Sequence, residues 1–153
     1  MGKLIFKYNG TLERFAGDAI MVIFGAPIPC ENHAFIAVRM ALEMKGEFQG
    51  LKKEWERKDY RLDIGMGLSS GYATVGNVGF EGRMDYSAIG NVTNLAARLC
   101  ERAKGGQILM SKGTFLHVED QVMAQEIGNI RYKGLQRPIV TFELIGLNRS
   151  QTD

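Results

Sequence analysis

The sequence has few cysteines, few prolines and no long hydrophobic run, and each scarcity excludes a class of protein. Cys30 and Cys100 are the only cysteines among 153 residues. Neither lies in a zinc-binding or disulfide-rich spacing, so a reducing, cytoplasmic setting is expected. The longest apolar run, 19–29, is well short of the roughly 20 residues that a membrane helix needs, and the sequence has no signal peptide. We expect no membrane contact from this segment, which could still be the cytosolic part of a larger or membrane-attached parent.

An excess of one charge is also absent. The 19 basic and 17 acidic residues leave a net charge of +2, and the basic residues are scattered, which argues against a nucleic-acid partner. With 45% hydrophobic residues the chain has the composition of a globular protein, and its length fits one domain.

Hydrophobic periodicity predicts antiparallel hairpins interleaved with helices, which indicates an α+β sandwich rather than a doubly wound parallel sheet. The segment between the last two predicted strands matches no clear pattern. The expected elements are a helix end over 1–9 closed by Asn9-Gly10, a hairpin of 11–15 with 19–24, a helix over 31–48, a second hairpin of 61–68 with 72–78, a loop over 79–85, a helix within 90–106, and strands over 107–111 and 139–146.

Asp18 follows a glycine at the predicted tip of the first hairpin. A projecting carboxylate there suits Mg²⁺, which is usually held by one or two carboxylates and substrate phosphates. An aspartate selected only for turn formation fits the same position, so this residue alone leaves both interpretations open.

Asn94 and Arg98 lie four residues apart on a predicted helix, so they share one face and can reach one ligand. An amide suits a sugar hydroxyl, and the planar guanidinium suits phosphate oxygens. Lys133, before a glycine, is another candidate phosphate-binding cation. A solvated surface would also explain all three. His33 and His117 lie in no triad or metal pattern, and we interpret both as incidental.

Three segments taken together resemble the catalytic domain of the class III nucleotidyl cyclases, the adenylate and guanylate cyclases. They are "GTLERFAGDAIMVIFGAP", "SSGYATVGNVGFEGRMDYSAIGNVTNLAARL" and "YKGLQRPIVTFEL". The resemblance covers nearly the whole chain, with a catalytic domain over 1–147 and a polar tail over 148–153. It implies a ferredoxin-like antiparallel sheet with helices, and a head-to-tail homodimer with active sites at the interface.

The family's reaction is attack of the 3′-hydroxyl of a nucleoside triphosphate on its own α-phosphate, with two Mg²⁺ or Mn²⁺ ions as cofactors. The resemblance implies that Asp18 is one of two metal-binding aspartates. It also implies that Asn94 orients the ribose, that Arg98 stabilises charge at the α-phosphorus, and that Lys133 binds the terminal phosphates.

Two further positions correspond to residues that recognise the purine base of the nucleotide in this family. Arg14 stands where adenylate cyclases usually carry lysine and guanylate cyclases glutamate, and Ser87 where many adenylate cyclases have Asp or Thr. A cation can donate to adenine N1, and a hydroxyl can accept from the adenine amino group. We therefore expect ATP as substrate and cyclic AMP as product, with a guanylate cyclase as the alternative.

The family's first strand, with its other metal-binding aspartate, has no counterpart in this sequence. We accordingly expect an N-terminally truncated domain with little activity of its own, whose first strand would precede Met1. The alternative is a degenerate, non-catalytic module that dimerises or binds nucleotide. A diguanylate cyclase is a weaker alternative, because no GGDEF-like signature occurs.

Overall fold

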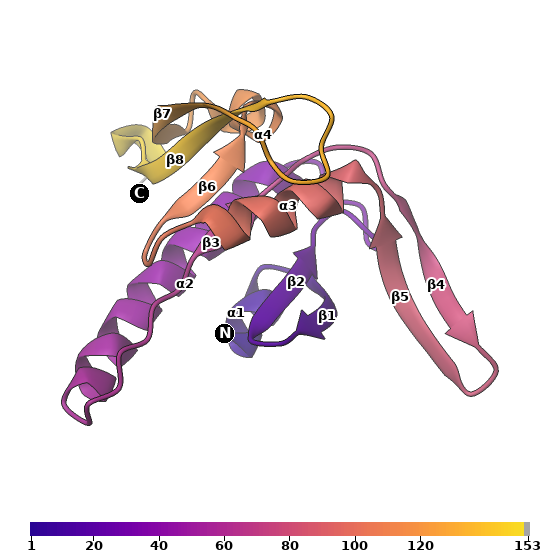
Figure 1. Ribbon diagram of the computed structural model, residues 1–153, viewed down its shortest axis with the longest axis horizontal. Helices are drawn as coiled ribbons and strands as arrows, with labels where there is room; N and C mark the ends of the chain where they lie inside the picture. Colours follow the sequence, from indigo (N-terminus) through magenta and orange to yellow (C-terminus); the bar gives the residue numbers. More distant parts are fainter. Residues whose placement is uncertain (152–153) are drawn as a thin grey trace.

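The computed structural model describes residues 1–151, which form helices and strands in a mixed α+β arrangement (Figure 1). The helices are α1 (Gly2–Lys7), α2 (His33–Glu56), α3 (Asn91–Arg102), α4 (Lys112–Val118) and the short 3₁₀ helix η1 (Arg149–Gln151). The strands are β1 (Thr11–Ala16), β2 (Ala19–Ile23), β3 (Met66–Leu68), β4 (Thr74–Phe80), β5 (Arg83–Ile89), β6 (Ile108–Ser111), β7 (Val122–Ile130) and β8 (Ile139–Leu147). Thr152 and Asp153, in the predicted polar tail, lie outside the described residues.

The N-terminal segment folds as the sequence predicts. Helix α1 ends before Asn9, which has a positive φ of 55°, and the Gly10 N–H donates to the Ile5 carbonyl at 2.9 Å. This is the hydrogen bonding of an Asn-Gly helix end. Strands β1 and β2 then pair antiparallel around a two-residue loop, Gly17-Asp18, in which Gly17 has a φ of 62°. The first predicted hairpin is therefore confirmed.

The predicted second hairpin is wrong in its pairing. Strand β3 pairs with β6 in parallel, whereas β4 pairs antiparallel with β5, so the stretch predicted as a loop over 79–85 is the outer end of a hairpin. Gly79 permits close pairing of the two strands at this end of the hairpin. A Cβ atom at Gly79 would lie 2.0 Å from the Arg83 carbonyl oxygen. The β4–β5 hairpin extends as an arm away from the other sheets (Figure 1).

The largest sheet has the strand order β3-β6-β8-β7 and carries a helix on each face. Strand β6 is buried along its whole length. Its Ile108 and Met110 pack in the cluster that includes α2, whereas Leu109, between them, packs with Leu99 of α3. Because successive strand residues face opposite sides, α2 and α3 cover opposite faces of the sheet.

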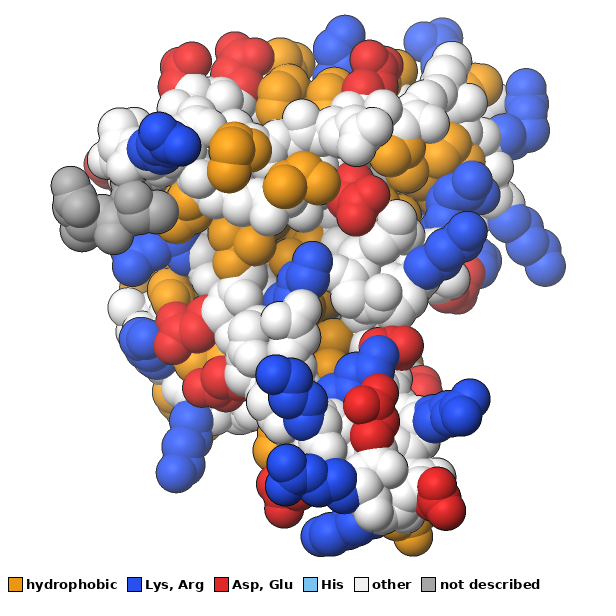
Figure 2. Space-filling view, turned by 90° about the vertical axis from the view of Figure 1, so that its left-hand side faces the viewer, with side chains coloured by type: hydrophobic (Ala, Val, Ile, Leu, Met, Phe, Trp, Pro, Cys, Tyr) orange, Lys and Arg blue, Asp and Glu red, His pale blue; other side chains and the backbone are white. Residues whose placement is uncertain are grey.

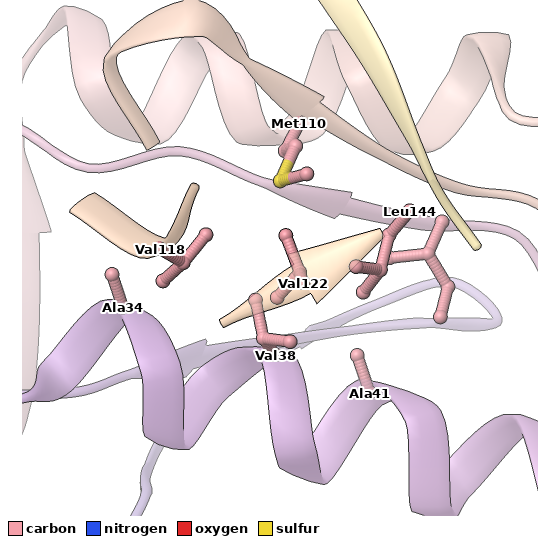
Figure 3. Close-up of a cluster of buried hydrophobic side chains, with 8 residues drawn as sticks. Ala34, Val38, Ala41, Met110, Val118, Val122 and Leu144 are labelled. Carbon is pink, nitrogen blue, oxygen red and sulfur yellow. The ribbon is translucent and has the colours of Figure 1, made fainter. Parts of the chain in front are cut away.

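Helix α2 provides the main core contact. Its Ala34, Val38 and Ala41 point toward Val118 of α4 and Leu144 of β8 (Figure 3). The helix ends at Glu56, later than predicted from 31–48, because the residues that follow are mostly good helix formers. The unpredicted segment after β6 forms α4 and β7, and β7 pairs along β8 to complete the sheet. The predicted α+β class is confirmed.

Candidate functional site

A bulge in β1 places two consecutive charged residues at one position of the hairpin. Leu12 pairs with Val22 and Arg14 with Met21, so Glu13 is an extra residue in the strand. The Glu13 side chain is only 3% exposed, whereas that of Arg14 is 57% exposed. Bulges re-aim side chains in this way. The Arg14 Nε atom lies 3.5 Å from the Glu13 Oε2 atom, forming an ion pair.

A hydrogen bond joins this bulge to β5. The Ser87 hydroxyl donates to Glu13 Oε1 at 2.6 Å, across 74 positions of sequence. The other carboxylate oxygen, Oε2, is buried and accepts no hydrogen bond within the described chain, although the Arg14 guanidinium lies beside it. Sequence reasoning selected Arg14 and Ser87 but missed Glu13. The available signal was an acid inside a β-rich run, and the bulge that buries it cannot be recognised from sequence.

An open pocket of about 370 Å³ lies where β1, β5 and α3 meet. It brings together three of the six predicted site residues, which come from three different elements. The lining residues are Arg14, Ser87, Ala88, Ile89, Gly90, Asn91, Thr93 and Asn94. The pocket therefore combines a cation, a hydroxyl and an amide, a donor and acceptor set that suits a polar heterocyclic ligand.

Helix α3 carries Asn94 and Arg98, and its approach to the sheet depends on glycine. A Cβ atom at Gly67 of β3 would lie 2.4 Å from both the Ala96 carbonyl oxygen and the Cys100 backbone nitrogen. The helix thus packs directly on the strand backbone. Asn94 is exposed at the pocket, and the Arg98 Nη1 atom forms an ion pair with Glu101 Oε2 at 2.7 Å. Arg98 does not line the pocket.

Lys133 lies in the β7–β8 loop, which packs against α3. The preceding residue, Tyr132, is buried beside Leu99, and its hydroxyl lies 2.9 Å from Thr141 Oγ1. The following residue, Gly134, turns the chain with a φ of 83°. Lys133 itself is exposed. The loop therefore holds an exposed cation next to the helix that carries Asn94 and Arg98, although Lys133 lies outside the pocket lining.

Asp18 does not line the pocket and lies at the exposed tip of the β1–β2 hairpin. The pKa of the Cys100 thiol is raised by burial and, to a lesser extent, by the charges of Glu101 and Asp18. Within residues 1–151, no group of three or more His, Cys, Asp or Glu side chains is arranged to hold a metal ion.

The two histidines meet at a separate, smaller pocket of about 140 Å³ that Glu31 and Gln121 also line. The His33 and His117 rings lie 5.8 Å apart, centroid to centroid, at 59°. None of the six predicted site residues lies there.

No helix within residues 1–151 is both long enough and apolar enough to cross a bilayer.

Known proteins resemble this chain in fold and in sequence. The adenylyl cyclase CyaB from P. aeruginosa is 34% identical with a TM-score of 0.86, over 97% of this chain and 78% of that structure. The guanylyl cyclase Cya2 is 30% identical with a TM-score of 0.88, over 99% and 77%. Adenylate cyclase 1 of Rhizobium meliloti is 27% identical over 97% of this chain. The chain spans about a quarter of the length of the curated relatives it matches.

The adenylate and guanylate cyclase catalytic domain family matches residues 3–146, and the two solved structures reproduce the α+β fold over nearly all of the described chain. The resemblance stated from the sequence motifs is thereby confirmed at the level of family and fold. This chain belongs to the adenylate and guanylate cyclase catalytic domain family.

Proposed function

We propose that this domain converts ATP to 3′,5′-cyclic AMP and pyrophosphate, and that the pocket between β1, β5 and α3 binds the nucleoside. The observation that carries the proposal is the convergence of Arg14, Ser87 and Asn94 on one pocket. These residues come from three elements, and the family resemblance assigns them to the base and the ribose. Incidental surface residues have no reason to converge in this way.

The choice of ATP over GTP rests on the two residues at the base position. Arg14 can donate to adenine N1, which is an acceptor, whereas guanine N1 carries a hydrogen. Ser87 can accept from the adenine amino group. Solved relatives of similar identity include an adenylyl and a guanylyl cyclase, so the family alone does not choose the base.

Three further side chains suit the ribose and the phosphates. In the proposed reaction the 3′-oxygen forms a bond to the α-phosphorus, the bond from that phosphorus to the bridging oxygen breaks, pyrophosphate leaves, and the proton of the 3′-hydroxyl passes to solvent. Asn94 would orient the ribose. Arg98 would break its ion pair with Glu101 and stabilise the charge that develops at the α-phosphorus. Lys133 would bind the terminal phosphates.

Asp18 fits a role in holding Mg²⁺ or Mn²⁺. Its carboxylate is exposed on a tight turn, and these ions typically take one or two carboxylates with the remainder of the ligands from phosphates and water. When bound, the ions supply charge stabilisation at the attacking and leaving oxygens. We expect the 153-residue chain to bind the nucleotide and to turn it over slowly.

We further propose that two copies of the chain form a homodimer in which Asp18 of one copy serves the pocket of the other. Asp18 does not line the pocket of its own chain. On the β4–β5 arm, Val78 and Phe80 share the strand face of Ser87, since Val78 pairs with Asp85, two residues from Ser87. Val78 is 49% and Phe80 72% exposed beside the Arg83–Asp85 ion pair, so this face of the arm offers two apolar side chains with charged neighbours to a second copy.

The surface charges and the cysteines bear on two further parts of the proposal, the class of ligand and the location of the protein. On the face shown in Figure 2, basic side chains are interspersed with acidic ones rather than gathered in one patch, which supports a nucleotide rather than a nucleic acid as the ligand. Cys30 and Cys100 are free thiols, which supports a cytoplasmic location.

Nucleotide binding and product formation test the proposal together. Calorimetric titration of the chain with ATP and with GTP, each with Mn²⁺, should give the lower Kd for ATP, and Arg98→Ala should weaken ATP binding. Cyclic AMP formation should be slow and should disappear in Asp18→Ala. A chain that binds neither nucleotide would contradict the proposal, and robust cyclic AMP formation abolished by Asp18→Ala would contradict the expectation of slow turnover.

One observation favours a second candidate, a non-catalytic nucleotide-binding or dimerisation module. Within residues 1–151 no three His, Cys, Asp or Glu side chains are arranged to hold a metal ion. Nucleotide binding without any product in the presence of Mn²⁺ would favour that module over the enzyme.

A further inference from the structure

We propose that Glu13 is a specificity-determining residue, which selects adenine by fixing the direction of the Ser87 hydroxyl and the orientation of Arg14. The inference rests on the proposed function, since it concerns how the same pocket distinguishes the two purine bases. Glu13 does not line the pocket. It acts through two residues that do.

The evidence begins with the burial of Glu13 behind the pocket. Its side chain is 3% exposed and contacts both base-position residues, accepting from the Ser87 hydroxyl at 2.6 Å and pairing with Arg14 Nε at 3.5 Å. A buried carboxylate is costly unless it is paired and hydrogen-bonded. The Ser87 hydroxyl satisfies Oε1, whereas the buried Oε2 accepts no hydrogen bond and has the Arg14 guanidinium beside it, so the position of this carboxylate depends on both base-position residues.

The Ser87 hydroxyl has a single hydrogen to donate, and an ionised carboxylate accepts hydrogen bonds but has no hydrogen to donate. Because the hydrogen points to Glu13, the Ser87 oxygen can only offer lone pairs to a ligand in the pocket. The adenine amino group is a donor and matches those lone pairs. The O6 atom of guanine is an acceptor and would face them without a hydrogen between the two oxygens, which is a mismatch.

Arg14 is constrained in a complementary way. Glu13 engages its Nε atom, so the Nη atoms remain for a ligand. Those donors match adenine N1 and meet a hydrogen on guanine N1. Glu13 therefore makes Ser87 an acceptor and Arg14 a donor toward the base. Adenine complements this pair of groups. Discrimination here comes as much from rejecting guanine as from binding adenine.

The substitution Glu13→Gln tests the inference, because the two side chains have the same shape. The glutamine amide can donate to the Ser87 oxygen, which frees the hydroxyl hydrogen to point into the pocket and removes the ion pair with Arg14. We expect the ratio of Kd for GTP to Kd for ATP, measured by calorimetry with Mn²⁺, to fall about tenfold, as expected when one hydrogen bond changes from matched to mismatched. Glu54→Gln, in a distant surface pair with Lys58, should leave the ratio unchanged.

A second variant shows whether Ser87 transmits the effect. Ser87→Ala alone should weaken ATP binding more than GTP binding, and it does not depend on the folding of the glutamine variant. In the Ser87→Ala background, Glu13→Gln should change the ratio much less than in the wild type. Equal changes in both affinities, or an unchanged ratio, overturn the inference.

The same data separate this inference from the proposed function. A wild-type chain that prefers GTP overturns the proposed substrate, whereas the direction of the change caused by Glu13→Gln still decides the role of Glu13. A chain that binds neither nucleotide contradicts both.

Discussion

Gly67 on β3 lies so close to α3 that a methyl group at that position would come within 2.4 Å of the Ala96 carbonyl oxygen. The obstructing atoms belong to the backbone of α3, which cannot rotate aside as a side chain can. The absence of a side chain at Gly67 therefore sets how near α3 lies to the sheet. Because Asn94 and the other pocket residues of α3 move with that helix, Gly67 also positions one wall of the pocket.

Replacing Gly67 with alanine should destabilise the fold and displace that wall. We expect a loss of about 1–3 kcal/mol in the free energy of unfolding, as is typical of overpacking, together with weaker ATP binding. Gly46 is the matched control, since it lies within α2 with open space around its Cβ position. Gly46→Ala should stabilise the chain by roughly 0.4–1 kcal/mol. Urea denaturation of both variants is the measurement, and an unperturbed Gly67→Ala would be contrary to the packing argument.

The Arg98–Glu101 ion pair should compete with the triphosphate. Both side chains are partly exposed, so Glu101→Gln should change stability by less than about 1 kcal/mol. Releasing Arg98 should tighten ATP binding severalfold, whereas Arg98→Ala should weaken it by about tenfold or more, because a charge-assisted bond to phosphate is lost. Calorimetric titration with ATP and Mn²⁺ decides the matter. If Glu101→Gln weakened binding as much as Arg98→Ala, the competition would not exist.

The Tyr132 hydroxyl should hold the loop that carries Lys133. Thr141 Oγ1 also donates to the Ile139 carbonyl at 3.2 Å, so Tyr132→Phe removes one buried hydrogen bond without leaving Thr141 unsatisfied. We expect a loss of about 0.5–1.5 kcal/mol in stability and a weaker affinity for ATP. In Lys133→Ala, by contrast, ATP binding should weaken while stability stays nearly constant. Thermal unfolding and calorimetry on the pair separate the two contributions.

Acid should loosen the contact between α1 and α2. Hydrogen bonds from Lys7, at 2.6 Å, and from Tyr8 hold the pKa of Glu43 below its ordinary value of 4.5. Because the pKa is lower in the folded chain, this stabilisation is complete above about pH 4.5 and is lost as the pH falls through the folded value. The difference in Tm between wild type and Glu43→Gln should therefore shrink from pH 6 to pH 3.

Glu47, on the same helix, provides the control for that titration. It is exposed, and Glu47→Gln should leave the Tm close to that of the wild type. A difference for Glu43→Gln that stays constant with pH would show that its carboxylate does not support the contact.

The exposed apolar residues of the β4–β5 arm should mediate self-association. Phe80→Asp places a charge on a residue that is 72% exposed, so it should shift the chain toward monomer without lowering its stability. Leu116→Asp, at a comparably exposed apolar residue of α4, should leave the oligomeric state unchanged. Sedimentation velocity distinguishes the two. A wild-type chain that is monomeric at all concentrations would argue against the proposed dimer.

Local signals in the sequence were sufficient for elements whose partners are close along the chain. The Asn9-Gly10 helix end, the turn at Gly17-Asp18 and the amphipathic helix around Asn94 all follow from neighbouring residues, and all are confirmed. Strand β3 is different. Its partner, β6, is distant in sequence and parallel to it, and the nearer strand β4 offered a plausible hairpin partner that the fold does not use.

The same distinction applies to the site. Arg14, Ser87 and Asn94 could be selected from motifs, and the structure brings them to one pocket. Glu13 could not be selected, because its importance depends on a bulge and on a contact with Ser87 far along the chain. Asp18, Arg98 and Lys133 were chosen on the same grounds, but a single chain places them outside that pocket.

The bulge at Glu13 makes the pocket depend on the number of residues in β1 as well as on their identity. Deleting one residue there would restore strict alternation and turn either the acid or the arginine to the opposite side of the hairpin. Transferring the proposed base-binding arrangement to another domain of this family would require moving the whole strand Thr11–Ala16. Grafting the arginine alone would transfer a charge without the acid that orients it.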